Sequence, residues 1–390
     1  MRAVRIIERL LFESLSDLHT KTIKSLLWGI ESVIVGDYLS LTAIGRSSMQ
    51  GNQVKHNIKR ADRLLANSGI HENCKRYFAV LAATLVGKNK QPIILVDWTD
   101  APKEHEAIVA AVPNGGRALS IYSEVYPIGT KGKTKIESSF LKTLKTILPA
   151  DCCPVIVTDA GFRNPWFKTV IKLGWHYVGR LRGKFCLKRQ HDDWLYSDEF
   201  LSQASARPVD LGNWITSKST PLHTRLVLVS KYKKTKTKKR RKSKKGSNPQ
   251  RKARARAKEP WLLCTSLSKQ KAKQIVKIYA TRMQIEEFFR DIKNHRFGWS
   301  FAYSRSGDSS RINTLILLAC FASLAVTLVG QAAENRGIHY AYQANTIKNR
   351  RVLSLFYLGI QVISRAEYDQ FSMHLLFGVM HQISVSITAV

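Results

Sequence analysis

The sequence predicts an α/β protein whose strand-forming core lies between helical segments. Short apolar runs separated by turn residues fill residues 91–183, and apolar positions recur at helical spacing before residue 88 and after residue 268. In addition, 44% of the 390 residues are hydrophobic. A chain of this length and apolarity can bury more than one core, so we expect two or three domains.

Residues 91–183 are expected to follow the order βββαβαβ. Three strands come first, with Pro113-Asn114-Gly115-Gly116 as the turn between the second and the third. The predicted strands are 92–100, 105–113, 118–127, 154–161 and 175–183, and the predicted helices are 136–148 and 165–174. Strands that alternate with amphipathic helices are typical of a sheet covered by helices.

Residues 1–88 are predicted to be helical, because apolar side chains recur in them at helical spacing. Residues 39–69 resemble two helices joined by a Gly-containing turn, an arrangement that suits DNA binding. The second helix carries four basic residues that could contact DNA: Lys55, Lys59, Arg60 and Arg63. The solvated face of an ordinary helix explains the same residues.

Residues 184–260 are irregular, with strand-like pieces at 185–189, 194–198 and 224–232. Within this zone, residues 231–258 contain 16 Lys or Arg among 28 positions and no acidic residue. Such a block repels itself, so we expect a disordered loop that can settle on phosphates.

From Trp261 the chain returns to a strand, 261–267, and then to a long helical stretch, 269–298. Thr314–Gly330 is uncharged over 17 residues, which suits a helix buried on all sides or, at the lower length limit, a membrane span. The final portion is helical, and 352–363 is its best amphipathic piece. The predicted domains are 1–88, 89–183, 184–260, 261–340 and 341–390, the last a candidate for dimerisation.

The chain is strongly basic, which narrows the choice of partner. Lys plus Arg number 63 and Asp plus Glu 28, so the net charge is +35, and +19 (35 − 16) remains without residues 231–258. Such a charge draws a protein to nucleic acid or to an anionic membrane surface. The six cysteines have no zinc-site spacing and no secretory signal is evident, so we expect reduced, buried thiols and a cytoplasmic location.

Two aspartates stand at the ends of apolar runs. Asp97 follows PIILV, and Asp159 follows PVIVT. A charged group there is costly unless it is paired or bound to a metal, and strand ends are where α/β sheets place ligands. Together the two would form an all-oxygen site suited to Mg²⁺ or Mn²⁺, whereas each alone is also explained as a strand-end or loop carboxylate.

A third carboxylate lies in the helical stretch 269–298. At about 100° per residue, one narrow stripe beside the apolar face contains Tyr279, Arg282, Glu286 and Lys293. Glu287 points to solvent on the same count, so we expect Glu286 to be the inward carboxylate. An ordinary i, i+4 ion pair accounts for Arg282 and Glu286 alone.

The spacing Tyr279-x2-Arg282-x3-Glu286-x6-Lys293, preceded by Asp97 and Asp159, resembles the Y-R-E-K signature and DDE triad of bacterial insertion-sequence transposases. The similar group includes the transposases of transposons five and ten and is known as the insertion sequence four family. The segments 96–100, 157–162 and 343–356 are most similar to the transposon-ten branch. Met283 departs from the Trp of some relatives, and the signature does not need residues 231–258.

The resemblance implies a ribonuclease-H-like core with a helical N-terminal DNA-binding domain and a helical C-terminal region. A β-rich insertion at 184–260 would account for the 127 positions that separate Asp159 from Glu286. Asp97, Asp159 and Glu286 would hold two Mg²⁺ or Mn²⁺ ions per active site.

The activity implied is cut-and-paste transposition. Cleavage at the transposon ends would pass through a hairpin, and strand transfer into target DNA would follow, carried out by a homodimer in a synaptic complex. The partners would be the terminal inverted repeats and target DNA in the bacterial nucleoid, with no membrane and no small-molecule substrate.

The same resemblance assigns DNA contacts. Tyr279, Arg282 and Lys293 would bind phosphates near the cut, and Trp261 would stack on a base flipped out of the transposon end. Core packing at a strand start also explains Trp261. Trp98 is expected to pack on the opposite strand face or to act as a second DNA wedge.

Three other functions remain open at the level of sequence. One is a basic DNA-binding regulator, or an inactive relative, in which the carboxylates only stabilise the fold. Another is a structure-selective nuclease with the same triad, which would cut DNA without joining ends. The last is a membrane-associated protein, for which residues 314–330 would have to reach lipid.

Overall fold

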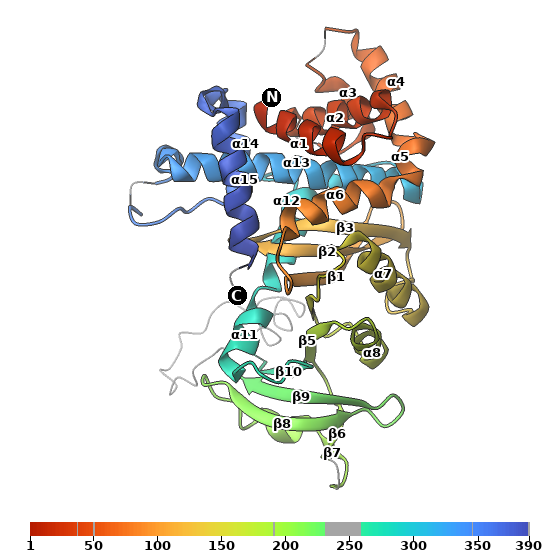
Figure 1. The fold of residues 1–390 in the computed structure, drawn as a ribbon, viewed down its shortest axis with the longest axis vertical. Coiled ribbons are helices and arrows are strands. Elements are labelled where there is room, and N and C mark those ends of the chain that lie inside the picture. The colour runs from red at the N-terminus through yellow and green to blue at the C-terminus, as the bar shows by residue number, and fades with distance from the viewer. Residues whose placement is uncertain (37, 50, 190–191, 231–258, 345, 389–390) are drawn as a thin grey trace, which may run out of the picture. The chain divides into compact units, whose positions relative to one another are not determined.

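A computed structural model describes residues 1–388 except 37, 50, 190–191, 231–258 and 345 (Figure 1). The chain folds as two compact units. Unit 1 comprises Met1–Cys152 and Met283–Val390, and unit 2 comprises Cys153–Arg282. The basic tract that we expected to be disordered, 231–258, lies outside the described residues.

Unit 1 combines helices with a sheet of three strands, and the predicted strand and helix segments of residues 91–148 coincide with observed elements. Its N-terminal helices are α1 Arg2–Ser14, α2 Thr20–Val35, α3 Leu41–Arg46, α4 Val54–Leu65, α5 Ser68–Glu72 and α6 Cys74–Val86. Its strands are β1 Ile93–Ala101, β2 His105–Asn114 and β3 Arg117–Pro127, followed by α7 Thr134–Ile147. Its later elements are α12 Met283–Lys293, η1 Phe301–Tyr303, α13 Ser309–Asn335, η2 Ile338–Tyr342, α14 Leu355–Ser364, η3 Glu367–Gln370 and α15 Met373–Thr388.

The sheet of unit 1 is an antiparallel meander in the order β3-β2-β1. The predicted turn between β2 and β3 is present, and Gly115 and Gly116 there have φ of 55° and 98°, which only glycine adopts readily. Helices α6, α12 and α13 pack against β3 (Figure 1). The mixed α/β class is therefore confirmed in this unit.

Helix α13 forms the centre of the helical part of unit 1. It is long and apolar enough to cross a membrane, but 94% of its most apolar stretch is buried inside the protein. This burial favours the core-helix interpretation of residues 314–330. A Cβ on Gly330 would lie 2.0 Å from the carbonyl oxygen of Leu355, and one on Gly359 would lie 2.0 Å from that of Val326. The two glycines thus let α13 and α14 approach closely.

Unit 2 begins with the predicted β-α-β segment and continues into an antiparallel region. Its elements are β4 Val155–Thr158, α8 Asn164–Lys172, β5 His176–Leu181, β6 Cys186–Lys188, β7 Leu195–Tyr196, α9 Asp198–Leu201, β8 Val209–Thr216, β9 Leu222–Val229, β10 Trp261–Thr265 and α11 Ala272–Ala280. Strand β4 pairs in parallel with β5, and the order continues β5-β10-β9-β8-β6-β7. The sequence had not predicted β8, which contains a bulge between Asp210 and Gly212 and whose residues before Trp214 are largely exposed.

The long helix predicted over residues 269–298 is interrupted. Helix α11 ends at Ala280 and α12 begins at Met283, with a turn at Thr281 and Arg282. The Thr281 hydroxyl donates to the carbonyl of Ile278 at 2.7 Å, and the amide of Arg282 bonds to Tyr279 in the tighter i to i−3 pattern. Side-chain competition for a helical carbonyl explains why the helix does not continue with one phase.

The cysteines form no disulfides, and Cys153 and Cys186 are half-buried rather than buried as expected.

Candidate active site

Asp97 lies in the middle of β1, not at its end as the sequence suggested. The strand extends to Ala101 because its pairing with β2 continues to the Ala101–His105 register. Asp97 is 8% exposed, and its Oδ1 accepts from the backbone N–H of Trp98 at 2.8 Å. Trp98 is itself buried and donates from Nε1 to Glu137 at 3.1 Å, so the structure supports packing rather than a DNA wedge.

Lys293 lies against the strand that carries Asp97. Its Nζ donates to Thr99 Oγ1 at 2.6 Å, and Thr99 shares the strand face of Asp97 because side chains alternate along β1. Burial lowers the pKa of Lys293, and the charges of Asp100 and Asp97 act in the opposite direction. The structure therefore brings Lys293 and Asp97 together within unit 1.

The environments of Glu286 and Glu287 in α12 are the reverse of those that we predicted. Glu286 is exposed, whereas the side chain of Glu287 is 25% exposed and pairs with Arg117 of β3 at 2.9 Å. The angular count did not separate the two residues, because they flank the apolar face of α12 on opposite sides, and Arg117 of β3 pairs on the side of Glu287. Glu286 and Lys293 are seven residues apart in α12, so they share one side of that helix.

In unit 2, Asp159 directly follows β4, as the sequence predicted, and is half-buried. Its Oδ1 accepts from the backbone N–H of Gly161 at 2.7 Å. Tyr279 of α11 is 3% exposed, and burial raises its pKa to about 12, with Arg282 and Arg180 lowering it and Asp159 raising it. Asp159 and the two arginines thus lie within electrostatic reach of the Tyr279 hydroxyl.

Trp261 stands beside the same tyrosine. The ring centroids of Trp261 and Tyr279 are 4.8 Å apart in an edge-to-face arrangement, and Trp261 is only partly buried at the start of β10. This position is compatible with core packing and with base stacking, since the indole packs on Tyr279 and remains partly exposed.

Arg180 of β5 is a site residue that our sequence reasoning missed. Its Nη2 donates to Glu259 at 3.3 Å, and Arg182 donates to the same carboxylate at 2.8 Å. The Nε of Arg180 is buried and has no hydrogen-bond partner among the described residues. Arg180 and Arg182 are two residues apart in HYVGRLRG, so they lie on one face of the strand. This pairing of basic residues is the sequence feature that could have indicated the site.

No group of three or more His, Cys, Asp or Glu side chains is placed to hold a metal ion within the described residues. Asp97 and Glu286 belong to unit 1, and Asp159 belongs to unit 2. As donors, the three side chains offer only carboxylate oxygens, which are hard ligands suited to Mg²⁺ or Mn²⁺ rather than to softer metals.

The N-terminal helix pair has the expected form. Helices α3 and α4 pack so closely that a Cβ on Gly45 would lie 2.6 Å from the backbone of Ile58. On α4, exposed side chains belong to Lys55, Lys59 and Arg63. Arg60 instead stacks its guanidinium 4.3 Å from the Trp28 ring centre, and burial followed by the charge of Arg63 lowers its pKa.

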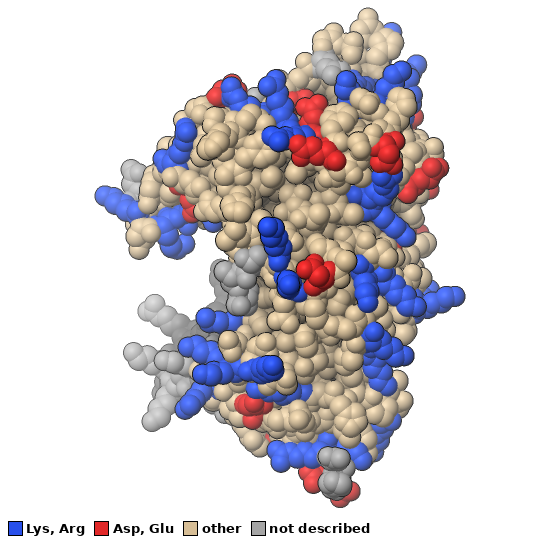
Figure 2. All heavy atoms as spheres, viewed as in Figure 1, with Lys and Arg blue, Asp and Glu red and all other residues tan. Residues whose placement is uncertain are grey.

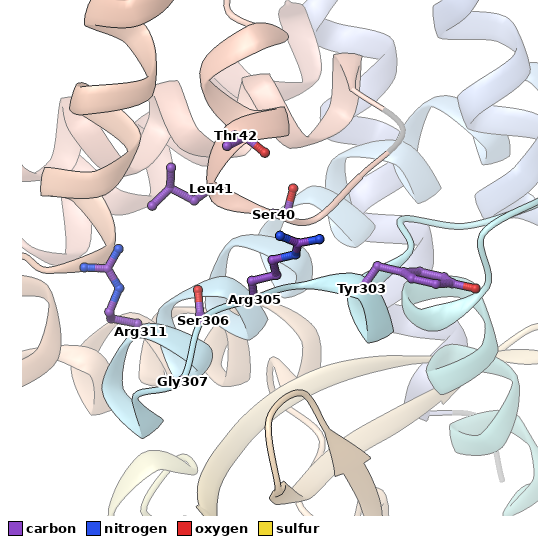
Figure 3. A pocket seen from close by; sticks show the side chains of 8 residues that line it. All are labelled: Ser40, Leu41, Thr42, Tyr303, Arg305, Ser306, Gly307 and Arg311. Carbon is purple, nitrogen blue, oxygen red and sulfur yellow. The ribbon is translucent and has the colours of Figure 1, made fainter.

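A hollow of about 390 Å³ opens beside the start of α3 in the same unit. Figure 3 shows Arg305 reaching from the segment before α13 toward Ser40, whereas Arg311 lies at the other side of the hollow. Arg311 pairs with Asp62 of α4 at 2.5 Å, whereas Arg305 is exposed. The exposed guanidinium of Arg305, beside the hydroxyl of Ser40, is a suitable donor group for a phosphate.

Comparison with known protein families decides the class of the protein. A family model described as a transposase DDE domain matches residues 88–322, more than half of the chain. The chain belongs to the transposase DDE domain family. Among curated proteins, none matches the chain. DDE transposases act on DNA and use divalent metal ions, and the matched range of this transposase contains Asp97, Asp159 and Glu286.

Proposed function

We propose that this transposase catalyses cut-and-paste transposition, cleaving the ends of a mobile element through a terminal hairpin and joining them to target DNA. The observation that carries the proposal is the gathering of Asp159, Tyr279 and Arg282 in unit 2. These are three signature positions, and Asp159 lies 120 positions before Tyr279 in the chain. The contact of Lys293 with the strand of Asp97 adds independent support from unit 1.

Asp97, Asp159 and Glu286 act as the catalytic carboxylates in this proposal. The backbone N–H groups of Trp98 and Gly161 hold the first two in fixed orientations. When bound, a pair of divalent cations neutralises charge on the attacking and leaving oxygens of a phosphodiester. The buried position of Asp97 suits such a cation, because a desolvated carboxylate is stabilised by positive charge, which Lys293 already supplies in part.

Tyr279, Arg282 and Arg180 bind the phosphates beside the cut. With a pKa of about 12, Tyr279 stays protonated at neutral pH, so its hydroxyl can donate to a phosphate oxygen. The guanidinium of Arg180 has a buried Nε without a hydrogen-bond partner among the described residues, and its planar fork matches phosphate oxygens. Lys293, held by Thr99, places a further cation beside Asp97.

Trp261 offers its surface-facing part to a base flipped out of the transposon end. Flipping a base costs a few kcal/mol, and stacking on an aromatic platform recovers about 1–3 kcal/mol of that cost. The edge-to-face contact with Tyr279 fixes the indole before DNA arrives, so little ordering remains to be done on binding.

The helical residues 1–88 recognise the terminal repeats in this proposal. Exposed Lys55, Lys59 and Arg63 on α4 contact one stretch of backbone, and Arg305 in the adjacent hollow contacts another. Two copies of the chain, joined through the bound ends, form the synaptic complex in the bacterial cytoplasm. Residues 341–390 are the candidate region for contact between the copies.

The decisive experiment uses a duplex that bears the inverted repeats flanking the gene. With Mg²⁺ we expect nicks, hairpins and joined products, and with EDTA none. Asp159→Asn should abolish all three, whereas Asp151→Asn, an exposed aspartate in the loop before β4, should leave them intact. Binding without metal-dependent cutting would identify a regulator instead, and cutting without joining would identify a structure-selective nuclease.

A further inference from the structure

One surface of unit 2 combines cations and aromatic rings in an ordered series. Lys184 lies 4.1 Å from the Tyr196 ring centre, and Arg189 lies 5.0 Å from that of Trp214. Lys188 and Lys218 both lie over Trp194, at 5.4 and 5.7 Å, and Arg163 lies 5.8 Å from Phe185. We call this surface the cation–aromatic face, defined by Arg163, Lys184, Phe185, Lys188, Arg189, Trp194, Tyr196, Trp214 and Lys218.

The same face is hollowed. An open hollow of about 560 Å³ lies between β6, the start of α8 and the loop that joins β8 to β9. Its lining includes Arg163, Arg182, Lys184 and Lys218, together with the side chains of Ser217 and Ser219. Figure 2 shows Lys and Arg side chains at the end of this unit where Figure 1 labels β6 and β7.

The five cations of this face form no ion pair with a carboxylate in the described part of the chain, although exposed Asp192, Asp193, Asp198 and Glu199 lie in the same stretch of sequence. Four of the five are exposed, and Lys188 is half-buried. Like charges held this close repel one another, so the arrangement gains stability when an anion with several negative groups binds.

The ring contacts indicate which part of an anion the face recognises. Each ring holds the stem and head of a cation in place, which lowers the entropy lost on binding. Because cations already occupy the ring faces concerned, bases have less aromatic surface to stack on, while the exposed heads of Lys184 and Lys218 remain accessible to an anion. Regularly spaced phosphates satisfy such donors better than unpaired bases do.

We propose that the cation–aromatic face is a second DNA-binding surface, which holds the phosphate backbone of duplex DNA without reading its sequence. The proposal rests on the proposed function in that DNA is the partner. None of the residues of the face is a signature residue or belongs to the cluster around Tyr279. The face therefore binds a stretch of duplex other than the scissile step.

The test removes three lysines of the face and compares the loss with removal of three others. The face variant is Lys184→Gln/Lys188→Gln/Lys218→Gln. The control variant removes the same charge from α7 and α8, with Lys135→Gln/Lys142→Gln/Lys172→Gln at exposed positions. Affinity for a duplex lacking the terminal repeats is measured between 50 and 200 mM salt in EDTA, so that no cleavage occurs.

If each lysine neutralises one phosphate, the slope of log affinity against log salt falls by about 2.7 in the face variant. The full-length protein should then lose about 40-fold more affinity than the face variant over this fourfold salt range. The control variant should keep the original slope. A Lys→Arg replacement at the three face positions, which retains the charge, should restore the slope and shows that the site tolerates substitution.

Three results would overturn the proposal: equal slopes in face and control variants, stronger competition by single-stranded than by duplex DNA, or equal competition by polyglutamate. Because these measurements are made without metal, they are independent of cleavage. Failure of Asp159→Asn to abolish nicking would instead refute the proposed function and leave the binding result standing.

Discussion

The neighbouring glutamates of α12 provide a sharp test of the catalytic assignment. Glu286 is the proposed catalytic carboxylate and is exposed, whereas Glu287 is held by Arg117 at 2.9 Å and also contacts Arg290. Replacing each with Gln removes one charge and keeps the size of the side chain. We expect Glu286→Gln to abolish catalysis and Glu287→Gln to affect mainly stability.

The expected changes in stability and cleavage rate follow from the surroundings of Glu287 and Glu286. Arg117 keeps its second partner, Asp291 at 2.8 Å, when Glu287 is neutralised. The loss is therefore the partly buried pair with Arg117 and the more exposed pair with Arg290, about 1 kcal/mol in all. For a protein of this size that corresponds to a fall of roughly 1–2 °C in Tm. Replacing the exposed Glu286 should change the free energy of unfolding by less than about 0.5 kcal/mol. Cleavage should fall roughly 10²–10³-fold or more, as when other charge-stabilising groups are removed.

The assay compares Tm with the rate of Mg²⁺-dependent nicking for both variants. Loss of nicking in Glu287→Gln with an active Glu286→Gln would show that α12 presents its other glutamate to the DNA. Our alignment of the signature with this helix would then be wrong by one residue.

Three further outcomes are expected. Trp261→Ala should reduce hairpin formation by about 10-fold or more while first-strand nicking persists, and Trp261→Phe should recover part of the loss; equal losses of both steps would contradict base stacking. Gly359→Ala should lower the free energy of unfolding by about 1–3 kcal/mol, because its Cβ would lie 2.0 Å from the Val326 carbonyl oxygen, and an unchanged denaturation midpoint would refute the close approach of α13 and α14. Burial raises the pKa of Asp291 to about 6, so its protonated form is favoured in the folded state and stability is lost as pH rises from about 4 to 6. Asp291→Asn should therefore gain up to about 3 kcal/mol relative to the original protein over this range, and a difference in chemical denaturation that does not change with pH would contradict the raised pKa.

The strands of residues 91–183 could be predicted because local signals determine them. Apolar runs of strand length ended at turn residues, and Gly115 and Gly116 satisfy a backbone conformation that few other residues adopt. Strand β8 was missed because its first residues are mostly exposed and carry no alternation. Its position depends on pairing with β9, which is a non-local interaction.

The candidate site likewise contains residues that the sequence predicted and one, Arg180, that it did not. Residue types at fixed spacing identified Asp97, Asp159, Glu286 and the Tyr-Arg-Lys set, and the transposase family match is consistent with that choice. Arg180 carried only a weak alternation signal, because what distinguishes it is its nearness to Tyr279, a residue 99 positions later in the chain.

The amino-acid sequence by itself determined the net charge of +35 and the family to which the chain belongs, and it predicts the carboxylates proposed to bind a metal ion. Only the tertiary structure decided which side chains are buried and which meet. Within α12, for example, the pairing of Glu287 with Arg117 of β3 depends on a strand that lies about 170 positions earlier in the chain. Periodicity is a local property, whereas burial and ion pairing depend on what packs against each face.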